Sequence, residues 1–95
     1  MREIVISAAD WKTPDDFYAD LLRALEAPAW HGHNLDALWD SITGGDISGI
    51  NPPFRIRIAE LDRTTESCRE IVEKLVNLIR DAHAAGFPVE IICNA

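Results

Sequence analysis

The sequence is poor in the features that identify several classes of protein. Only two of its 95 residues are cysteine, too few for the disulfide framework of a small secreted domain. Basic residues are also scarce: nine face sixteen acidic ones, and the net charge of −7 disfavours nucleic acid or an anionic membrane as a direct partner. No apolar run approaches the ~20 residues of a membrane span, and acidic residues interrupt the apolar N-terminus, unlike a signal peptide. We therefore expect two free thiols and a cytoplasmic protein.

The composition that is present suits one small domain. Hydrophobic residues make up 47% of the chain, which is enough to build a core. A length of 95 residues predicts a single domain over residues 1–95, without a linker or repeat. We expect the free protein to be a monomer. Its acidity favours a basic protein as partner, because opposite charges speed the encounter of two surfaces.

Strands and helices alternate along the sequence. Short β-branched or alternating apolar segments predict strands at 3–7, 54–59 and 89–93. Helices are expected from Pro14 to Pro28, from Asn34 to Gly44 and over about 66–85, and residues 60–65 are compatible with a short helical turn. Strands separated by helices favour a parallel sheet. The predicted fold is α/β, a three-stranded parallel sheet packed with about four helices in two layers.

The second predicted helix has two distinct faces. Helical spacing places an apolar stripe at Leu35, Leu38, Trp39 and Ile42, which predicts Trp39 in the core. A neighbouring face carries Asp36, Asp40 and Thr43.

Asp40 is the residue that local stability does not explain. Asp36 lies near the helix N-terminus, where the helix dipole favours an acid, but Asp40 lies toward the other end. A like-charge pair at i,i+4 costs about 0.2–0.5 kcal/mol. Two interpretations remain open: a solvated acidic face that tolerates this small cost, or a surface meant for a positively charged partner.

The segment WHGHNLDALWD, Trp30 to Asp40, resembles the signature of the barstar family, the bacterial inhibitors of barnase-type ribonucleases. The resemblance continues through Thr43-Gly44, and more weakly through the element order and the segment from Arg80 to Ile92. It implies a barstar-like fold and an inhibitor, not an enzyme, that binds a ribonuclease of the extracellular bacterial type or a related basic toxin one-to-one. Its helix and preceding loop would block the active site by mimicking RNA phosphate.

The resemblance also implies roles for individual residues. Asp40 matches the central acid that enters the phosphate pocket, Asp36 flanks it, and Trp30 matches an aromatic residue that packs on a catalytic histidine. Asp81, on the last helix, matches an acid that pairs with a basic enzyme residue. The complete expected partner-binding set is Trp30, His31, Gly32, Asn34, Leu35, Asp36, Trp39, Asp40, Thr43, Gly44 and Asp81.

The chain departs from the family pattern at four positions. Ala85 stands where the family often has a further acid, and Gly45 where the best-known member has a tryptophan. His31 replaces a common aromatic residue, and Ser41 a common cysteine. Losing a peripheral acid should weaken binding mainly through slower association. These departures put the identity of the partner in question more than the mode of inhibition.

Other functions have less support in the sequence. The pair His31 and His33 has the spacing of a metal site, with His83 as a remote third ligand, but no cysteine or carboxylate stands beside it at ligand spacing, and no metal or cofactor is expected. Nucleophile and phosphate-loop motifs are missing. The alternative that stays open is a barstar-like interaction or immunity module whose basic partner is not a ribonuclease.

Overall fold

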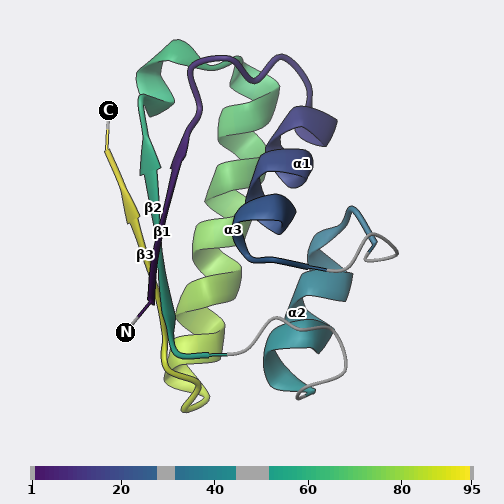
Figure 1. Ribbon diagram of the computed structural model, residues 1–95, viewed down its shortest axis with the longest axis vertical. Coiled ribbons are helices and arrows are strands. Elements are labelled where there is room, and N and C mark those ends of the chain that lie inside the picture. The colour runs from purple at the N-terminus through teal and green to yellow at the C-terminus, as the bar shows by residue number, and fades with distance from the viewer. Residues whose placement is uncertain (1, 28–31, 45–51, 95) are drawn as a thin grey trace.

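A parallel three-stranded sheet organises the protein. The computed structural model describes residues 2–27, 32–44 and 52–94. The strands are β1 (Arg2–Ser7), β2 (Phe54–Ala59) and β3 (Val89–Cys93), ordered β1-β2-β3 with both pairs parallel. The register places Ile4 opposite Ile56, and Ile56 opposite Ile91. The predicted α/β fold with its parallel sheet is confirmed, and β2 is the central strand (Figure 1).

The helices differ in number and length from the expectation. The described residues hold three α-helices, α1 (Pro14–Ala24), α2 (Leu35–Thr43) and α3 (Glu66–Ala84), and the 3-10 turn η2 (Leu61–Arg63). The count of α-helices is therefore slightly below the expected four. Helix α1 also ends before Pro28, because the backbone of Glu26 adopts a left-handed conformation with φ of 60°. Within the described residues, no helix has the length and apolarity needed to cross a membrane.

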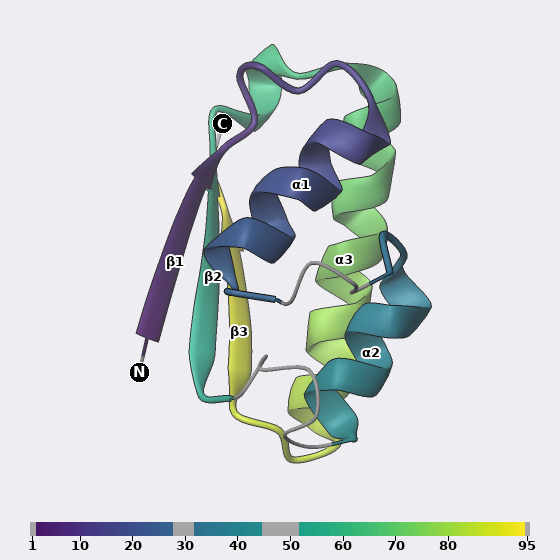
Figure 2. The same cartoon turned by 45° about the vertical axis from the view of Figure 1, so that its right-hand side comes forward.

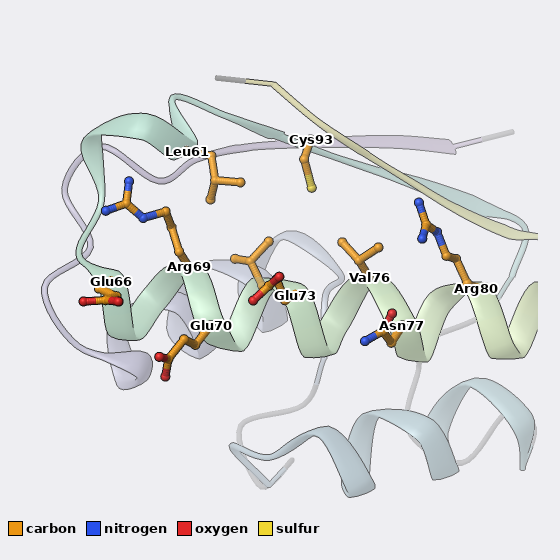
Figure 3. A pocket seen from close by; sticks show the side chains of 10 residues that line it. Leu61, Glu66, Arg69, Glu70, Glu73, Val76, Asn77, Arg80 and Cys93 are labelled. Atoms are coloured by element: carbon orange, nitrogen blue, oxygen red, sulfur yellow. The ribbon is translucent and has the colours of Figure 1, made fainter.

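All three helices lie on the same side of the sheet (Figure 2). Helices α1 and α3 cover the sheet, while α2 packs mainly on α3, on the side of α3 that faces away from the strands (Figure 3). The apolar residues of β2 that point toward the helices are fully buried; they are Phe54, Ile56 and Ile58. The opposite face of the sheet is open, and Val5 is 60% exposed there.

Threonine side chains cap the N-termini of α1 and α3. The hydroxyl of Thr13 accepts a hydrogen bond from the backbone N–H of Asp16, whose carboxylate accepts hydrogen bonds from the N–H groups of Lys12 and Thr13 at 2.9 and 3.2 Å. These hydrogen bonds hold the pKa of Asp16 below its ordinary value of 3.8. Helix α3 begins in a similar way, with the Thr65 hydroxyl accepting from the N–H of Cys68. Both cysteines are free thiols.

Because only one face of the sheet is covered, shortening a side chain on the covered face should destabilise the protein more than shortening one on the open face. Ile56→Ala should lower the free energy of unfolding by about 2–5 kcal/mol, because Ile56 is fully buried beneath the helices. Val5→Ala, on the open face, should lower it by less than about 0.5 kcal/mol. Urea denaturation of both variants measures the difference. Equal destabilisation would show that the open face is covered in solution.

The capping carboxylate of Asp16 predicts a pH-dependent contribution to stability. Because its pKa is lowered on folding, this contribution is complete above the ordinary pKa of 3.8 and is lost as the pH falls through the lower, folded value. The free energy of unfolding of wild type should therefore be higher than that of Asp16→Asn near neutral pH. This difference between the two proteins should become smaller in acid. Asp10→Asn is the control, since the Asp10 side chain makes no hydrogen bond with the described residues. If the difference in free energy of unfolding is the same at neutral and acidic pH, the carboxylate of Asp16 does not stabilise the fold in the proposed way.

Candidate partner-binding site

Polar contacts at both ends fix the extent of α2. The Asn34 side-chain oxygen accepts a hydrogen bond from the N–H of Ala37 at 2.7 Å, as an N-cap does. At the other end, the N–H of Gly44 donates to the carbonyl oxygen of Asp40 at 2.7 Å. A Cβ atom on Gly44 would lie 2.6 Å from that oxygen, so the close turn requires glycine. Asn34 and Gly44 thus position the helix that carries the acids.

The apolar stripe of α2 is only partly buried. Leu38 and Ile42 are buried, with exposed fractions of 1% and 2%, whereas Leu35 and Trp39 are half-buried. The expectation that Trp39 belongs to the core is therefore only partly right. Helix α2 is the outermost element of the fold, and Trp39 lies where α2 meets α3, with part of its ring open to solvent. Its apolar surface is accessible beside the acidic residues.

The side chains of Asp36 and Asp40 are exposed. Among the described residues, no hydrogen bond or ion pair reaches either side chain. Both acids lie one turn apart on the same face of α2, as the helical spacing predicts. Their charges are therefore available to a molecule outside the domain.

The two arginines of β2 form ion pairs on the open face of the sheet. On the open face of the sheet, Arg55 contacts Glu90 at 3.2 Å and Glu3 at 3.4 Å, and Arg57 contacts Glu3 at 3.4 Å. Arg57 first, and Arg55 second, lower the pKa of Glu3, and Glu90 is the main cause that raises the pKa of Arg55. Since α2 lies beyond α3 from the sheet (Figure 2), these cations do not meet Asp36 or Asp40.

Thr43 is oriented by its own helix. Its hydroxyl donates a hydrogen bond to the carbonyl oxygen of Trp39 at 2.8 Å, and its side chain is half-buried. With the proton committed, the oxygen can only accept hydrogen bonds from a partner. Thr43 therefore suits the same donors as the two carboxylates, the N–H groups of lysine or arginine.

A groove between α2 and α3 brings Asp81 beside Asp36 of α2. It has a volume of about 360 Å³. Its lining residues come from both helices and are Leu35, Asp36, Trp39, Lys74, Asn77, Leu78 and Asp81. Asp36 and Asp81 thus share one groove, although they lie 45 positions apart in the sequence. Apolar side chains and carboxylates together suit the stem and the charged end of an arginine or lysine.

The loop before α2 is described only from Gly32 onward, so Trp30 and His31 lie outside the described residues. His33 is exposed, and its Nδ1 lies 3.0 Å from a carboxylate oxygen of Asp15 on α1. Its ring stacks on that of Tyr18 with centroids 6.2 Å apart. Burial, and secondarily the charge of Asp36, raises the pKa of Tyr18. These contacts tie the loop to α1 beside the acidic face.

Some residues of the site do not stand out in the sequence. Lys74 and Leu78 line the groove from α3, and Tyr18 and Asp15 hold His33 from α1. The helical spacing of Lys74, Leu78 and Asp81 does place them on one side of α3. Nothing in the sequence shows, however, that this side of α3 meets α2.

A second groove lies on the other side of α3, between that helix and β3 (Figure 3). It is larger, about 640 Å³, and its charged lining residues are Glu66, Arg69, Glu70, Glu73 and Arg80. Three acids and two arginines thus line this second groove. It shares only Asn77 with the groove beside α2, so its residues serve as matched controls for the acidic site.

This geometry presents hydrogen-bond acceptors and negative charge on a protruding helix, which is suited to a cationic surface. Comparison with known proteins agrees with it: residues 1–94 match the family described as "Barstar (barnase inhibitor)". The chain belongs to the barstar family. This protein of the barstar family is also 43% identical over 44 residues to the "Putative ribonuclease inhibitor YrdF" of Bacillus subtilis (strain 168). That match covers 46% of this chain and 48%, about half, of the relative's length.

The exposed position of Asp40 predicts that removing its charge does not damage the fold. Asp40→Ala should leave the free energy of unfolding within about 0.5 kcal/mol of wild type and shift it upward, because it removes the repulsion with Asp36 and introduces a better helix former. Thermal or urea denaturation at low salt measures the change. A loss of 2 kcal/mol or more, by the usual scale of about 0.5–3 kcal/mol for damaging mutations, would mean that Asp40 makes a contact within the domain.

Proposed function

We propose that this barstar-family domain inhibits a barnase-type ribonuclease inside the cell that makes it. The observation that carries the proposal is the pair of exposed carboxylates of Asp36 and Asp40 on the outermost helix, which no cation of the described residues pairs with. Helix α2 and the loop before it enter the active-site cleft of the enzyme, one inhibitor to one enzyme. The domain itself performs no reaction.

The chemistry of the enzyme explains why carboxylates would block it. A ribonuclease binds a polyanion and stabilises extra negative charge on phosphorus during cleavage, so its cleft is lined with cationic donors. A carboxylate offers two acceptor oxygens to those donors, and an arginine can bind it through two parallel hydrogen bonds. An acidic helix therefore competes with RNA for the same groups.

Each site residue has a role in this arrangement. Asp40 enters the phosphate-binding part of the cleft, and Asp36 and Asp81 bind a cation at the groove between α2 and α3. Thr43 and the backbone at Gly44 contact the edge of the cleft. Asn34 and Gly32 shape the entrance to α2: a Cβ on Gly32 would lie 3.0 Å from the Asn34 side chain and 3.3 Å from that of Ala37. By the family resemblance, Trp30 and His31 contact the enzyme from the loop.

A basic partner other than a ribonuclease is the second candidate. The exposed Ala85, at the C-terminus of α3, favours it, because a family acid that would face the enzyme is missing there. The two candidates differ in a simple assay. Only an inhibitor of a ribonuclease slows RNA cleavage by barnase, whereas a module for another toxin leaves that cleavage unchanged.

Removal of the Asp40 carboxylate should weaken inhibition of the ribonuclease without damaging the fold of the inhibitor. Asp40→Ala should weaken inhibition of barnase by at least about a hundredfold, because basic groups of the cleft would be left buried without their partner. The apparent inhibition constant is measured from RNA cleavage at several salt concentrations. Added salt should weaken inhibition by wild type, chiefly through slower association.

Glu73→Ala is the matched control for Asp40→Ala. It changes the net charge equally from an exposed position on α3, in the groove on the other side of that helix (Figure 3). Inhibition by the Glu73 variant should stay within about threefold of wild type, as expected of a charge remote from the contact. Equal inhibition by the Asp40 and Glu73 variants would refute the proposed mechanism.

A further inference from the structure

Among the described residues that line the groove holding Asp36 and Asp81, Lys74 is the one cation. It is exposed on α3, and no carboxylate of the described residues lies within ion-pair distance of its ammonium group, not even Glu70 four residues earlier. In a domain with sixteen acidic residues, this positive charge is left unpaired at the edge of the proposed contact surface.

The position of Lys74 is defined relative to the acids. Lys74 and Asp81 lie seven residues apart on the same side of α3, which is about 10 Å along the helix axis. Leu78 lies between them, and Leu35, Asp36 and Trp39 of α2 form the other wall of the groove. The groove is therefore negative at Asp36 and Asp81 and positive at Lys74, with an apolar floor between the charges.

We propose that Lys74 determines which ribonucleases this inhibitor accepts. It favours an enzyme with an acidic residue beside the basic residue that binds between Asp36 and Asp81, and it disfavours an enzyme whose cleft edge is basic throughout. This inference rests on the proposed function, since it assumes that the groove meets the edge of a ribonuclease cleft. It adds a charge requirement that the acids of the site do not impose.

The proposed preference arises because Lys74 repels nearby cations of the enzyme, while the acids of the site attract the enzyme as a whole. Every acid of the site attracts a cationic enzyme, so acids alone make the inhibitor bind basic clefts without discrimination. An unpaired ammonium group at the rim opposes a lysine or arginine placed against it and pairs with a carboxylate. Specificity of this kind requires a repulsive element as well as attractive ones.

Two other roles of Lys74 make different predictions. Its aliphatic stem could only cover Leu78 and Trp39, in which case the sign of the charge at its end would not matter. Its charge could also act only at long range, by reducing the net charge of the domain, in which case any lysine or arginine of α3 would have the same effect. A charge reversal at Lys74 and a matched reversal elsewhere on α3 separate these roles.

The test uses barnase as the probe, with residues at the edge of its cleft changed one at a time to Glu and to Lys. For each position, the ratio of the two dissociation constants gives the inhibitor's preference for a basic over an acidic residue. The preference is measured for wild type, Lys74→Glu and Arg69→Glu. Arg69 lies on the same helix but lines the groove on the far side (Figure 3), so both substitutions change the net charge equally.

Lys74→Glu should increase the preference for Lys over Glu by at least about fivefold at one position, or at two adjacent ones, on the barnase cleft edge. Lys74→Gln should give a smaller change in the same direction. Arg69→Glu should change the preference by less than about twofold at every position, because the intervening solvent and salt screen its charge. Circular dichroism confirms that the variants are folded.

Either of two results would overturn the inference while leaving the proposed function intact. In the first, Lys74→Glu and Arg69→Glu change the preference equally, which would make Lys74 a long-range charge only. In the second, barnase is inhibited, but substitution of Lys74 changes the preference at no position of the cleft edge. If no barnase variant is inhibited by wild type, or if inhibition is independent of Asp40, the proposed function fails, and the role of Lys74 fails with it.

Discussion

The packing of α2 on α3 is the interaction on which the site depends. Leu38 and Ile42 of α2 are almost completely buried, and α3 is the element that this helix of only nine residues mainly packs on. So short a helix is not stable by itself, because its first turn costs more conformational entropy than its few hydrogen bonds return. The contact with α3 therefore supplies most of the stability of α2. It also sets the direction in which Asp36 and Asp40 point, away from the core.

Within the part of the chain that the structure describes, the fold also keeps the arginines of β2 away from the acids of the site. The two arginines of β2 point to the open face of the sheet, where Glu3 and Glu90 pair with them. Parallel sheets are usually covered on both faces, and here these ion pairs border the uncovered one. The sheet itself and α3 lie between that face and α2, the helix that carries Asp36 and Asp40 (Figure 2). The acids consequently keep their negative charge available for a partner.

Local rules of helix stability are broken where the site requires it. The pair of acids on α2 repel each other weakly, while the N-terminus of the same helix follows the rules of capping, with Asn34 as the N-cap residue. A small energetic cost on an exposed face is easily tolerated by a domain whose core is well filled. A departure from local preference within an otherwise regular helix is what a binding surface is expected to show.

The sequence by itself determined the strands, the helix caps and the faces of α2, because periodicity and capping depend on neighbours a few residues away. It therefore predicted Asp36, Asp40 and Thr43 on one side. Only the tertiary structure decided that α2 lies outside α3, that Trp39 stays half-exposed, and that Lys74 and Asp81 join Asp36 in one groove. These relations depend on which side chains of distant segments pack together, and the spacing within one helix carries no information about the helix it meets.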